Sequence, residues 1–220
     1  MIFIEIALLS CLVPYLLGSL SFSIIVSKLL FHQDVREFGS GNAGMTNILR
    51  TFGKGAAALT LIGDMGKGFL AVWLNWKFIG SVVDGAPAIF CIYLAAFFAV
   101  IGHIYPVFFG FKGGKAVAVS AGPIIGIQPL LVLPLLVIFA VVLAIWKMVS
   151  LSSISCAVAY PIVTFCYYYF SGWYSPEIVA TATVGSVIVA ALVIWLHRGN
   201  IARIKAGTEY KFFQKKGRDQ

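Results

Sequence analysis

The chain has 220 residues, of which 60% are hydrophobic and 11% are charged, and its formal net charge is +8 at pH 7. A soluble domain usually has about a quarter charged residues, so this composition excludes a soluble globular protein. Apolar stretches recur along the whole chain. We therefore predict an all-helical integral membrane protein, with a single transmembrane domain over residues 1–209 and a basic interfacial tail over residues 210–220.

The apolar stretches predict the transmembrane helices, because a membrane-spanning helix needs about 20 residues. The fourth predicted helix is shorter than this and contains Gly122, Pro123 and Gly126. We expect it to pack inside the bundle, where neighbouring protein satisfies the backbone groups of a broken helix. The sequence predicts seven helices in all: Ile2–Leu30, Gly55–Ile79, Ala86–Tyr105, Ala116–Ile127, Pro129–Val149, Leu151–Phe170 and Pro176–Leu196.

Lysine and arginine residues predict the orientation in the membrane. They concentrate after the first, third and seventh predicted helices, with one at the end of the fifth, whereas the other side of a seven-helix bundle has Lys77 alone. Because basic loops remain in the cytoplasm, we expect the N-terminus outside and the C-terminus in the cytoplasm. This pattern accounts for the positive charge without a nucleic-acid partner.

Three polar segments interrupt the hydrophobic pattern, and the first is Gly39–Arg50, with the sequence GSGNAGMTNILR. Its glycines permit a tight turn that offers backbone N–H groups to an anion, and its Ser, Asn, Thr and Arg side chains add donors. Gly39, Gly41 and Gly44 also fit a dinucleotide-binding pattern, but that pattern requires a preceding strand, and here a membrane helix precedes it. A flexible polar loop is the other alternative, against which the density of donors argues.

The second polar segment, Gly102–Lys115, follows the third predicted helix. Lys112 and Lys115 bracket two glycines before the fourth helix, so both lysines can flank an anion held at the helix N-terminus. The spacing is not that of a Walker A loop. Ordinary cytoplasmic lysines are the alternative, and His103, taken alone, is as consistent with a structural role.

The third polar segment, His197–Glu209, closes the seventh predicted helix. His197 and Asn200 share a face if that helix continues through them, and Arg203 can reach a lipid phosphate or a substrate. The alternative is an amphipathic basic tail on an anionic membrane surface. We assign that alternative to residues 210–220 only.

Asp64 and Lys67 lie within the second predicted helix, three residues apart. Ionisable groups at membrane depth are usually either paired within the bundle or functional. Their spacing permits a mutual ion pair, and contact with a substrate is an equal alternative.

Together these segments resemble the signature segments of the bacterial acyl-phosphate:glycerol-3-phosphate acyltransferases, the PlsY family. They occur in the family's order and are spread over almost the whole chain. Ala43 stands where the family often has Pro, and Ala116 where Gly is frequent. The matching patterns are GSGNxGxTNxxR at Gly39–Arg50, DxxKG at Asp64–Gly68, GHxxPVFxxFKGGK at Gly102–Lys115 and HRxNIxRxxxGxE at His197–Glu209.

The resemblance implies a seven-helix protein of the bacterial cytoplasmic (inner) membrane, with the signature segments on the cytoplasmic side. It also implies the reaction: transfer of a fatty acyl group from acyl phosphate to the 1-hydroxyl of glycerol 3-phosphate, giving lysophosphatidic acid and phosphate. We expect no cofactor, no metal and no nucleic acid, and a monomer surrounded by membrane lipids. A phosphate-ester transporter and a lipid-binding membrane protein are the alternative functions.

For this reaction we expect the first segment to form one phosphate site, Lys112 and Lys115 to neutralise the leaving phosphate, and His197 and Asn200 to orient the acceptor. The base stays open between His103, His197 and a substrate phosphate oxygen, which we favour, and no acylated Ser40 is required. The catalytic candidates are Ser40, Arg50, His103, Lys112, Lys115, His197 and Asn200. The phosphate-binding candidates are Gly39, Gly41, Asn42, Gly44, Thr46, Asn47, Gly113, Gly114 and Arg203, with Asp64 and Lys67 as supporting residues.

The sequence also bears on the acyl donor. Another class of glycerol-phosphate acyltransferases uses a His-x4-Asp pair as its base, and none of His32, His103 and His197 is followed by Asp at that spacing. Acyl-CoA and acyl-carrier donors are therefore disfavoured. Acyl phosphate has a good leaving group, so the main tasks of such an enzyme are positioning and charge stabilisation.

Overall fold

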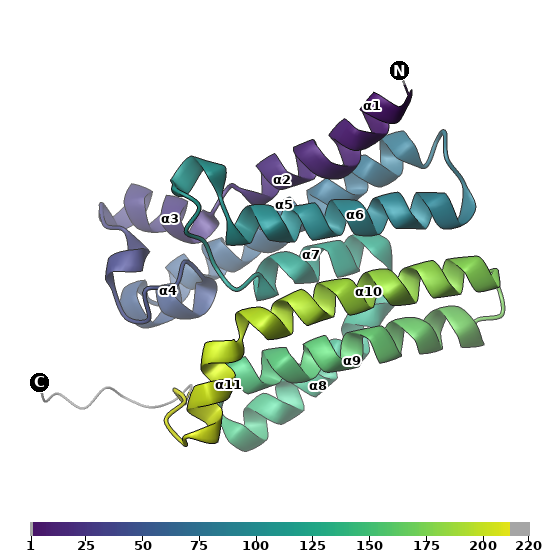
Figure 1. The fold of residues 1–220 in the computed structure, drawn as a ribbon. Coiled ribbons are helices and arrows are strands. Elements are labelled where there is room, and N and C mark those ends of the chain that lie inside the picture. Colours follow the sequence, from purple (N-terminus) through teal and green to yellow (C-terminus); the bar gives the residue numbers. More distant parts are fainter. Residues whose placement is uncertain (1, 212–220) are drawn as a thin grey trace, which may run out of the picture.

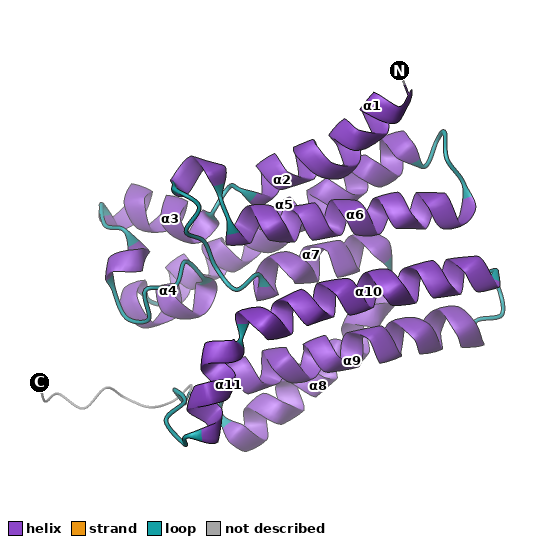
Figure 2. Ribbon diagram, in the orientation of Figure 1, coloured by secondary structure: helices purple, strands orange, loops and turns teal. Residues whose placement is uncertain are grey.

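A computed structural model describes residues 2–211, whose regular elements are all helical (Figure 2). Long helices lie side by side, and short helical segments gather at one end of the bundle (Figure 1). The expected all-helical fold is confirmed, and the tail beyond residue 211 lies outside the described residues. The elements are α1 (Ile2–Ala7), η1 (Leu8–Leu12), α2 (Val13–Gly18), α3 (Phe22–Phe31), η2 (Val35–Glu37), α4 (Met45–Phe52), α5 (Lys54–Ile79), α6 (Gly85–Ile104), η3 (Val107–Phe109), α7 (Val117–Ile127), η4 (Pro129–Leu131), α8 (Val132–Trp146), α9 (Val149–Phe170), α10 (Pro176–Leu196) and α11 (Arg198–Lys205).

Six helical stretches among the described residues are long and apolar enough to cross a membrane. Their outward faces expose large apolar side chains, such as Leu133 and Phe170, which are 61% and 75% exposed. Apolar surface of this extent belongs in lipid. The remaining apolar helix is α7, whose 11 residues extend only about 16 Å. It lies in the middle of the bundle in Figure 1, where the sequence led us to expect a short fourth helix.

The first stretch is not the continuous helix predicted over Ile2–Leu30. Pro14 has no N–H to donate one turn back, and the helix widens into the π-helical turn η1 just before it. The chain then leaves the helical conformation between Gly18 and Phe22. This break frees the carbonyl of Leu20, which accepts a hydrogen bond of 2.7 Å from the ammonium of Lys67 on α5.

Helix α7 packs most extensively against α5, and glycine makes that contact possible. A Cβ atom on Gly68 would overlap the carbonyl oxygen of Val119, and one on Gly122 would overlap that of Met65. The two backbones therefore approach as closely as membrane helices do at small residues. This packing fixes α7, and with it the loop that precedes it.

The three polar segments meet at one end of the bundle. In Figure 1, α3, α4 and α11 lie at this end together with the loop between α6 and α7, whereas α1 lies at the opposite end. Segments separated by more than a hundred residues therefore share one face of the molecule.

Candidate functional site

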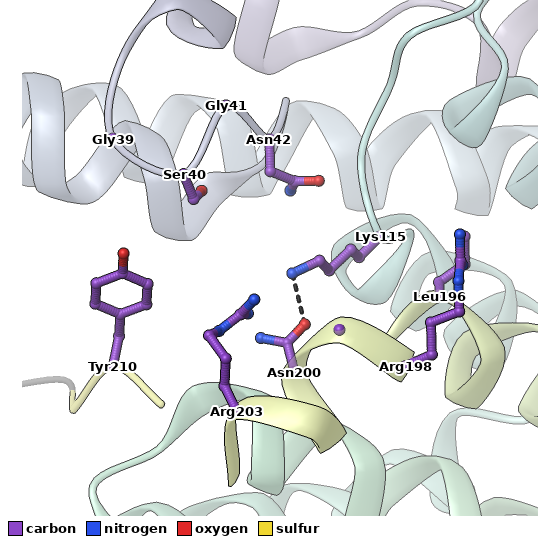
Figure 3. A pocket seen from close by; sticks show the side chains of 11 residues that line it. Gly39, Ser40, Gly41, Asn42, Lys115, Leu196, Arg198, Asn200, Arg203 and Tyr210 are labelled. Carbon is purple, nitrogen blue, oxygen red and sulfur yellow. Dashed lines mark hydrogen bonds between the residues drawn. The ribbon is translucent and has the colours of Figure 1, made fainter. Parts of the chain in front are cut away.

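A cavity of about 560 Å³ opens at this end of the bundle, between the three polar segments (Figure 3). The turn after η2 forms one side, Lys115 enters from the loop before α7, and α11 forms the other side. Its walls therefore combine glycines, hydroxyl and amide groups, and cations. The lining residues are Gly39, Ser40, Gly41, Asn42, Lys115, Leu196, Arg198, Gly199, Asn200, Arg203 and Tyr210.

The turn on the first side is built around the side chain of Asn47. Its Nδ2 donates to the carbonyls of Val35 and Phe38 at 3.0 Å each, and its Oδ1 accepts from the backbone N–H of Ser40 at 3.1 Å. Gly39 has a φ of +58°, a conformation that glycine adopts without strain. The buried side chain of Asn47 thus makes its hydrogen bonds within the turn and stabilises it, and the turn places Ser40 at the cavity.

Backbone N–H groups of this turn already have acceptors. That of Gly41 donates to the carbonyl of Phe38, and that of Gly44 donates to the carbonyl of Asn42. The amide of Ser40 is held by Asn47. The expectation that this turn offers backbone N–H groups to an anion is therefore wrong for Ser40, Gly41 and Gly44. From this turn, the side chains of Ser40 and Asn42 are the donors that line the cavity.

The second polar segment delivers one lysine to the cavity. The N–H groups of Gly113 and Gly114 donate to the carbonyls of Ile104 and His103, so they are not available to an anion, contrary to the sequence expectation. A Cβ on Gly114 would overlap the His103 ring, so this glycine lets the loop lie against the end of α6. Lys115 consequently lines the cavity, whereas Lys112 is exposed to solvent outside it.

The residue after Lys115 is in an unusual conformation. Ala116 has a φ of +64°, in the left-handed region that only glycine adopts readily. The family resemblance places Gly at this position frequently, and the structure supplies the physical reason for that preference. Ala116 is the N-cap of α7, directly after Lys115, so the direction in which the loop enters the helix depends on this residue.

Asn200 links the second and third segments. Its Oδ1 accepts a hydrogen bond of 2.6 Å from the Lys115 ammonium, and its Nδ2 donates to Glu209 Oε1 at 2.7 Å. Because both ends of the amide have partners, its orientation is fixed. The sequence analysis placed His197 and Asn200 on one face only if the helix continued through them. The helix does not continue, because α10 ends at Leu196 and α11 begins at Arg198.

Glu209 is the acidic centre of this arrangement, and the sequence assigned it no role. Besides Asn200, its carboxylate accepts from Ser150 Oγ at 2.7 Å and from Arg203 Nε at 2.8 Å. Burial alone would raise the pKa of Glu209, but these hydrogen bonds outweigh it and hold the pKa below its usual range. We call Lys115, Asn200, Arg203 and Glu209 the cavity cluster.

Two basic groups at the site have lowered pKa values. Burial lowers the pKa of Lys115, and the nearby charges of Arg203 and Arg50 lower it further. Burial also lowers the pKa of His197, whose Nδ1 lies 2.8 Å from the carbonyl oxygen of Val193. A carbonyl only accepts, so Nδ1 carries the proton and Nε2 of the neutral ring has a free lone pair.

Arg36, in η2 just before the first polar segment, contacts the second polar segment, which the sequence analysis did not predict. Its guanidinium donates to the carbonyl of Phe109 at 2.7 Å and to that of Lys112 at 3.3 Å. It is oriented by Asp34, which it contacts at 2.8 Å, and this interaction lowers the pKa of Asp34 to about 2. The feature of the sequence that could have indicated this contact is the pair of Asp34 and Arg36, two residues apart and just before the glycine-containing turn.

Comparison with known proteins assigns the chain to a family. Residues 8–207 match the family model described as glycerol-3-phosphate acyltransferase. The chain is 39% identical to a glycerol-3-phosphate acyltransferase of Paraburkholderia phytofirmans over 213 residues, which cover 96% of this chain and 94% of the relative. The chain belongs to the glycerol-3-phosphate acyltransferase family.

The fold of this acyltransferase matches solved relatives as well. The crystal structure of PlsY (YgiH), an integral membrane glycerol 3-phosphate acyltransferase, in its glycerol 3-phosphate form has a TM-score of 0.78 and 33% identity, covering 96% of this chain and 100% of that one. Its lysophosphatidic acid form has a TM-score of 0.77 and 31% identity, covering 94% and 95%. The family, the membrane fold and the enzyme class expected from the motifs are confirmed.

The acyltransferase brings together only part of the predicted site. His197 is buried and does not line the cavity, and Arg50 does not line it either but contacts the ring of Tyr210, which does. Thr46, like Asn47 and Lys112, is not among the lining residues. The predicted residues that do line the cavity are Gly39, Ser40, Gly41, Asn42, Lys115, Asn200 and Arg203.

A second group of charges lies inside the helix bundle, formed by Asp64, Lys67 and His103. The Lys67 ammonium is 2.8 Å from Asp64 Oδ1 and 3.0 Å from His103 Nδ1. An ammonium only donates, so Nδ1 of His103 accepts. All three residues are buried and none lines the cavity. Of the two alternatives for Asp64 and Lys67, the mutual ion pair is therefore the one that the structure shows. We call Asp64, Lys67 and His103 the bundle cluster.

Proposed function

We propose that this acyltransferase transfers a fatty acyl group from acyl phosphate to the 1-hydroxyl of glycerol 3-phosphate in the cavity between the three polar segments. The observation that carries the proposal is the convergence of Ser40, Lys115 and Arg203 on one cavity at the end of a membrane bundle. The glycerol 3-phosphate and lysophosphatidic acid forms of PlsY also support it, because these molecules are the acceptor before and after acylation.

The reaction needs one bond to form and one to break. The 1-hydroxyl oxygen attacks the acyl carbon, the bond from that carbon to the phosphate oxygen breaks, and the hydroxyl proton passes to a phosphate oxygen of the substrate. Lys115 stabilises the negative charge that develops on the leaving phosphate. Ser40 and Asn42 donate hydrogen bonds from the facing turn. No covalent acyl-enzyme is needed.

The acceptor is held on the α11 side of the cavity. Asn200, oriented by Glu209, positions the glycerol part, and Arg203 and Arg50 bind its phosphate. His197 is oriented by Val193 and supports this side. His103 is locked against Lys67 within the bundle cluster, so we assign it and Asp64 and Lys67 to the support of the loop that carries Lys115.

The deciding experiment supplies the purified, detergent-solubilised protein with palmitoyl phosphate and radiolabelled glycerol 3-phosphate. Labelled lysophosphatidic acid is expected, with palmitoyl-CoA giving none in a parallel reaction. Equal product from palmitoyl-CoA would refute the donor assignment, and absence of product from the folded protein would refute the reaction. A mass increase of one acyl group on Ser40 would refute direct transfer.

We also propose that the chain crosses a bacterial cytoplasmic membrane seven times, with α7 as the fourth crossing and the cavity on the cytoplasmic side. The positions of α1 and α11 at opposite ends of the bundle support an odd number of crossings (Figure 1). Single cysteines placed at Ser81 and at Lys205 in a cysteine-free variant test this. A membrane-impermeant maleimide should label position 81, and not 205, in intact cells; the reverse result refutes the orientation.

A further inference from the structure

Tyr210 stands at the edge of the cavity and has no role in the proposed reaction so far. It lies beyond residues 8–207, which the family model matches. The residue is 53% exposed and lines the cavity. The guanidinium carbon of Arg50 is 4.9 Å from the ring centre, and that of Arg203 is 5.9 Å from it. Both distances lie within the range of a cation–π interaction.

The ring is anchored by its neighbour in the sequence. Glu209 is buried, and its carboxylate accepts hydrogen bonds from Ser150 on α9 and from Asn200 and Arg203 on α11. These contacts fix the backbone on the N-terminal side of Tyr210. The ring is therefore placed against α11 and α4 by a buried network, although it follows the last helix of the described chain.

The two arginines depend on this ring to different degrees. Arg203 is also held by Glu209, which accepts from its Nε at 2.8 Å. The side chain of Arg50 makes no hydrogen bond or ion pair within residues 2–211, and its contact with the Tyr210 ring connects α4 to the segment that follows α11. The charges of both guanidiniums help to lower the pKa of Lys115, which lines the cavity.

We propose that Tyr210 is a positioning residue that holds Arg50 and Arg203 together for the phosphate of glycerol 3-phosphate. Two guanidiniums in one place repel each other, and the negative face of an aromatic ring attracts both. With the ring present, the cations are gathered before the phosphate arrives, so binding needs less ordering of side chains. The inference rests on the proposed function, because it assigns a ligand to the same cavity.

Steady-state kinetics with both substrates test the proposal. Tyr210→Leu, which removes the ring, should raise KM for glycerol 3-phosphate about fivefold and leave kcat and the KM for acyl phosphate within twofold. Tyr210→Phe, which keeps the ring, should retain wild-type values. Trp73→Leu is the matched control, since Trp73 faces Lys77 at 5.8 Å near the far end of α5, away from the cavity.

A graded series separates the electrostatic effect from packing. Fluorinated phenylalanines at position 210 keep the shape of the ring while weakening its negative face stepwise, so KM for glycerol 3-phosphate should rise with each added fluorine at unchanged thermal stability. A flat series, or a change in kcat and both KM values together, overturns the inference while wild-type activity stands. Absence of wild-type activity would instead reject the proposed function.

Discussion

The bundle cluster and the cavity cluster each combine a carboxylate with a lysine ammonium, but their cations differ in their access to solvent. The side chains of Asp64 and Lys67 are 1% and 2% exposed, whereas that of Arg203 is 38% exposed. In the bundle cluster, Lys67 is surrounded by partners from the protein: Asp64, His103 and the freed carbonyl of Leu20. In the cavity cluster, the cations keep donors directed at open space. The bundle cluster is therefore suited to stabilising the fold, and the cavity cluster is suited to binding an anionic substrate.

Breaking the bundle cluster should produce the largest effect, and it should be an effect on stability. Asp64→Asn leaves the Lys67 charge buried without its acid, which costs about 3–5 kcal/mol of unfolding free energy. Denaturation in detergent measures this, and Asp84→Asn, at an exposed position before α6, is the control expected to change stability by less than about 0.5 kcal/mol.

The double variant Asp64→Asn/Lys67→Met sharpens this result. Removing both charges should restore part of the stability, because a buried ion pair can be replaced by apolar groups at little cost. If Asp64→Asn instead unfolded like the wild type but lost its turnover, the distinction between the two clusters would fail.

Removing a charge from the cavity cluster should act on catalysis instead. Lys115→Met is expected to lower kcat/KM about 100-fold, since it deletes a preorganised donor to the leaving phosphate. The matched control is Lys112→Met, on the same loop but exposed and outside the cavity, for which we expect a change below threefold. Similar losses in both variants would mean that the loop attracts substrate through its total charge rather than through one placed lysine.

The long helices could be predicted from the sequence, because the length of each apolar stretch and the polar, Gly or Pro residues at its ends determine where a helix begins and ends. The helix predicted over Pro176–Leu196 has the bounds of α10, and that predicted over Gly55–Ile79 begins one residue after α5. The break between α2 and α3 was missed because the stretches on both sides of it are apolar, although Pro14, Gly18 and the serines at positions 19, 21 and 23 mark it. That break is stable because Lys67, distant in sequence, caps the freed carbonyl of Leu20.

The candidate site was predictable in its segments but not in its contacts. Donor-rich motifs identified Ser40, Lys115 and Asn200, all of which line the cavity. No local pattern distinguishes Lys115 from Lys112, because the choice depends on where α7 and α11 pack. Glu209 is held in part by Ser150 on α9, a contact that spans 59 residues and that no local pattern reveals.

Within the cavity cluster, Glu209 should matter less than Lys115, because it acts through other residues. Glu209→Gln removes the charge that holds Arg203 and Asn200, and we expect kcat/KM to fall about tenfold, as for the loss of one charged hydrogen bond. Glu177→Gln, in the exposed first turn of α10, is the control expected to match the wild type. A wild-type rate for Glu209→Gln would show that Asn200 and Arg203 keep their positions without the carboxylate.

The pH dependence of the cavity cluster should give the smallest effect. Lys115 stabilises the leaving phosphate only while it is protonated, and its pKa lies below the usual 10.5. As pH rises through this lowered pKa the ammonium is lost, so kcat/KM, which reports the free enzyme, should decline at a lower pH than an unperturbed lysine would allow. Lys115→Arg, with a side chain that stays charged, should move this decline to higher pH even if its overall rate is lower. An unchanged alkaline limb in that variant would assign the titration to another group and leave Lys115 without the proposed charge role, whereas the bundle cluster, sealed from solvent, should leave the profile unaffected.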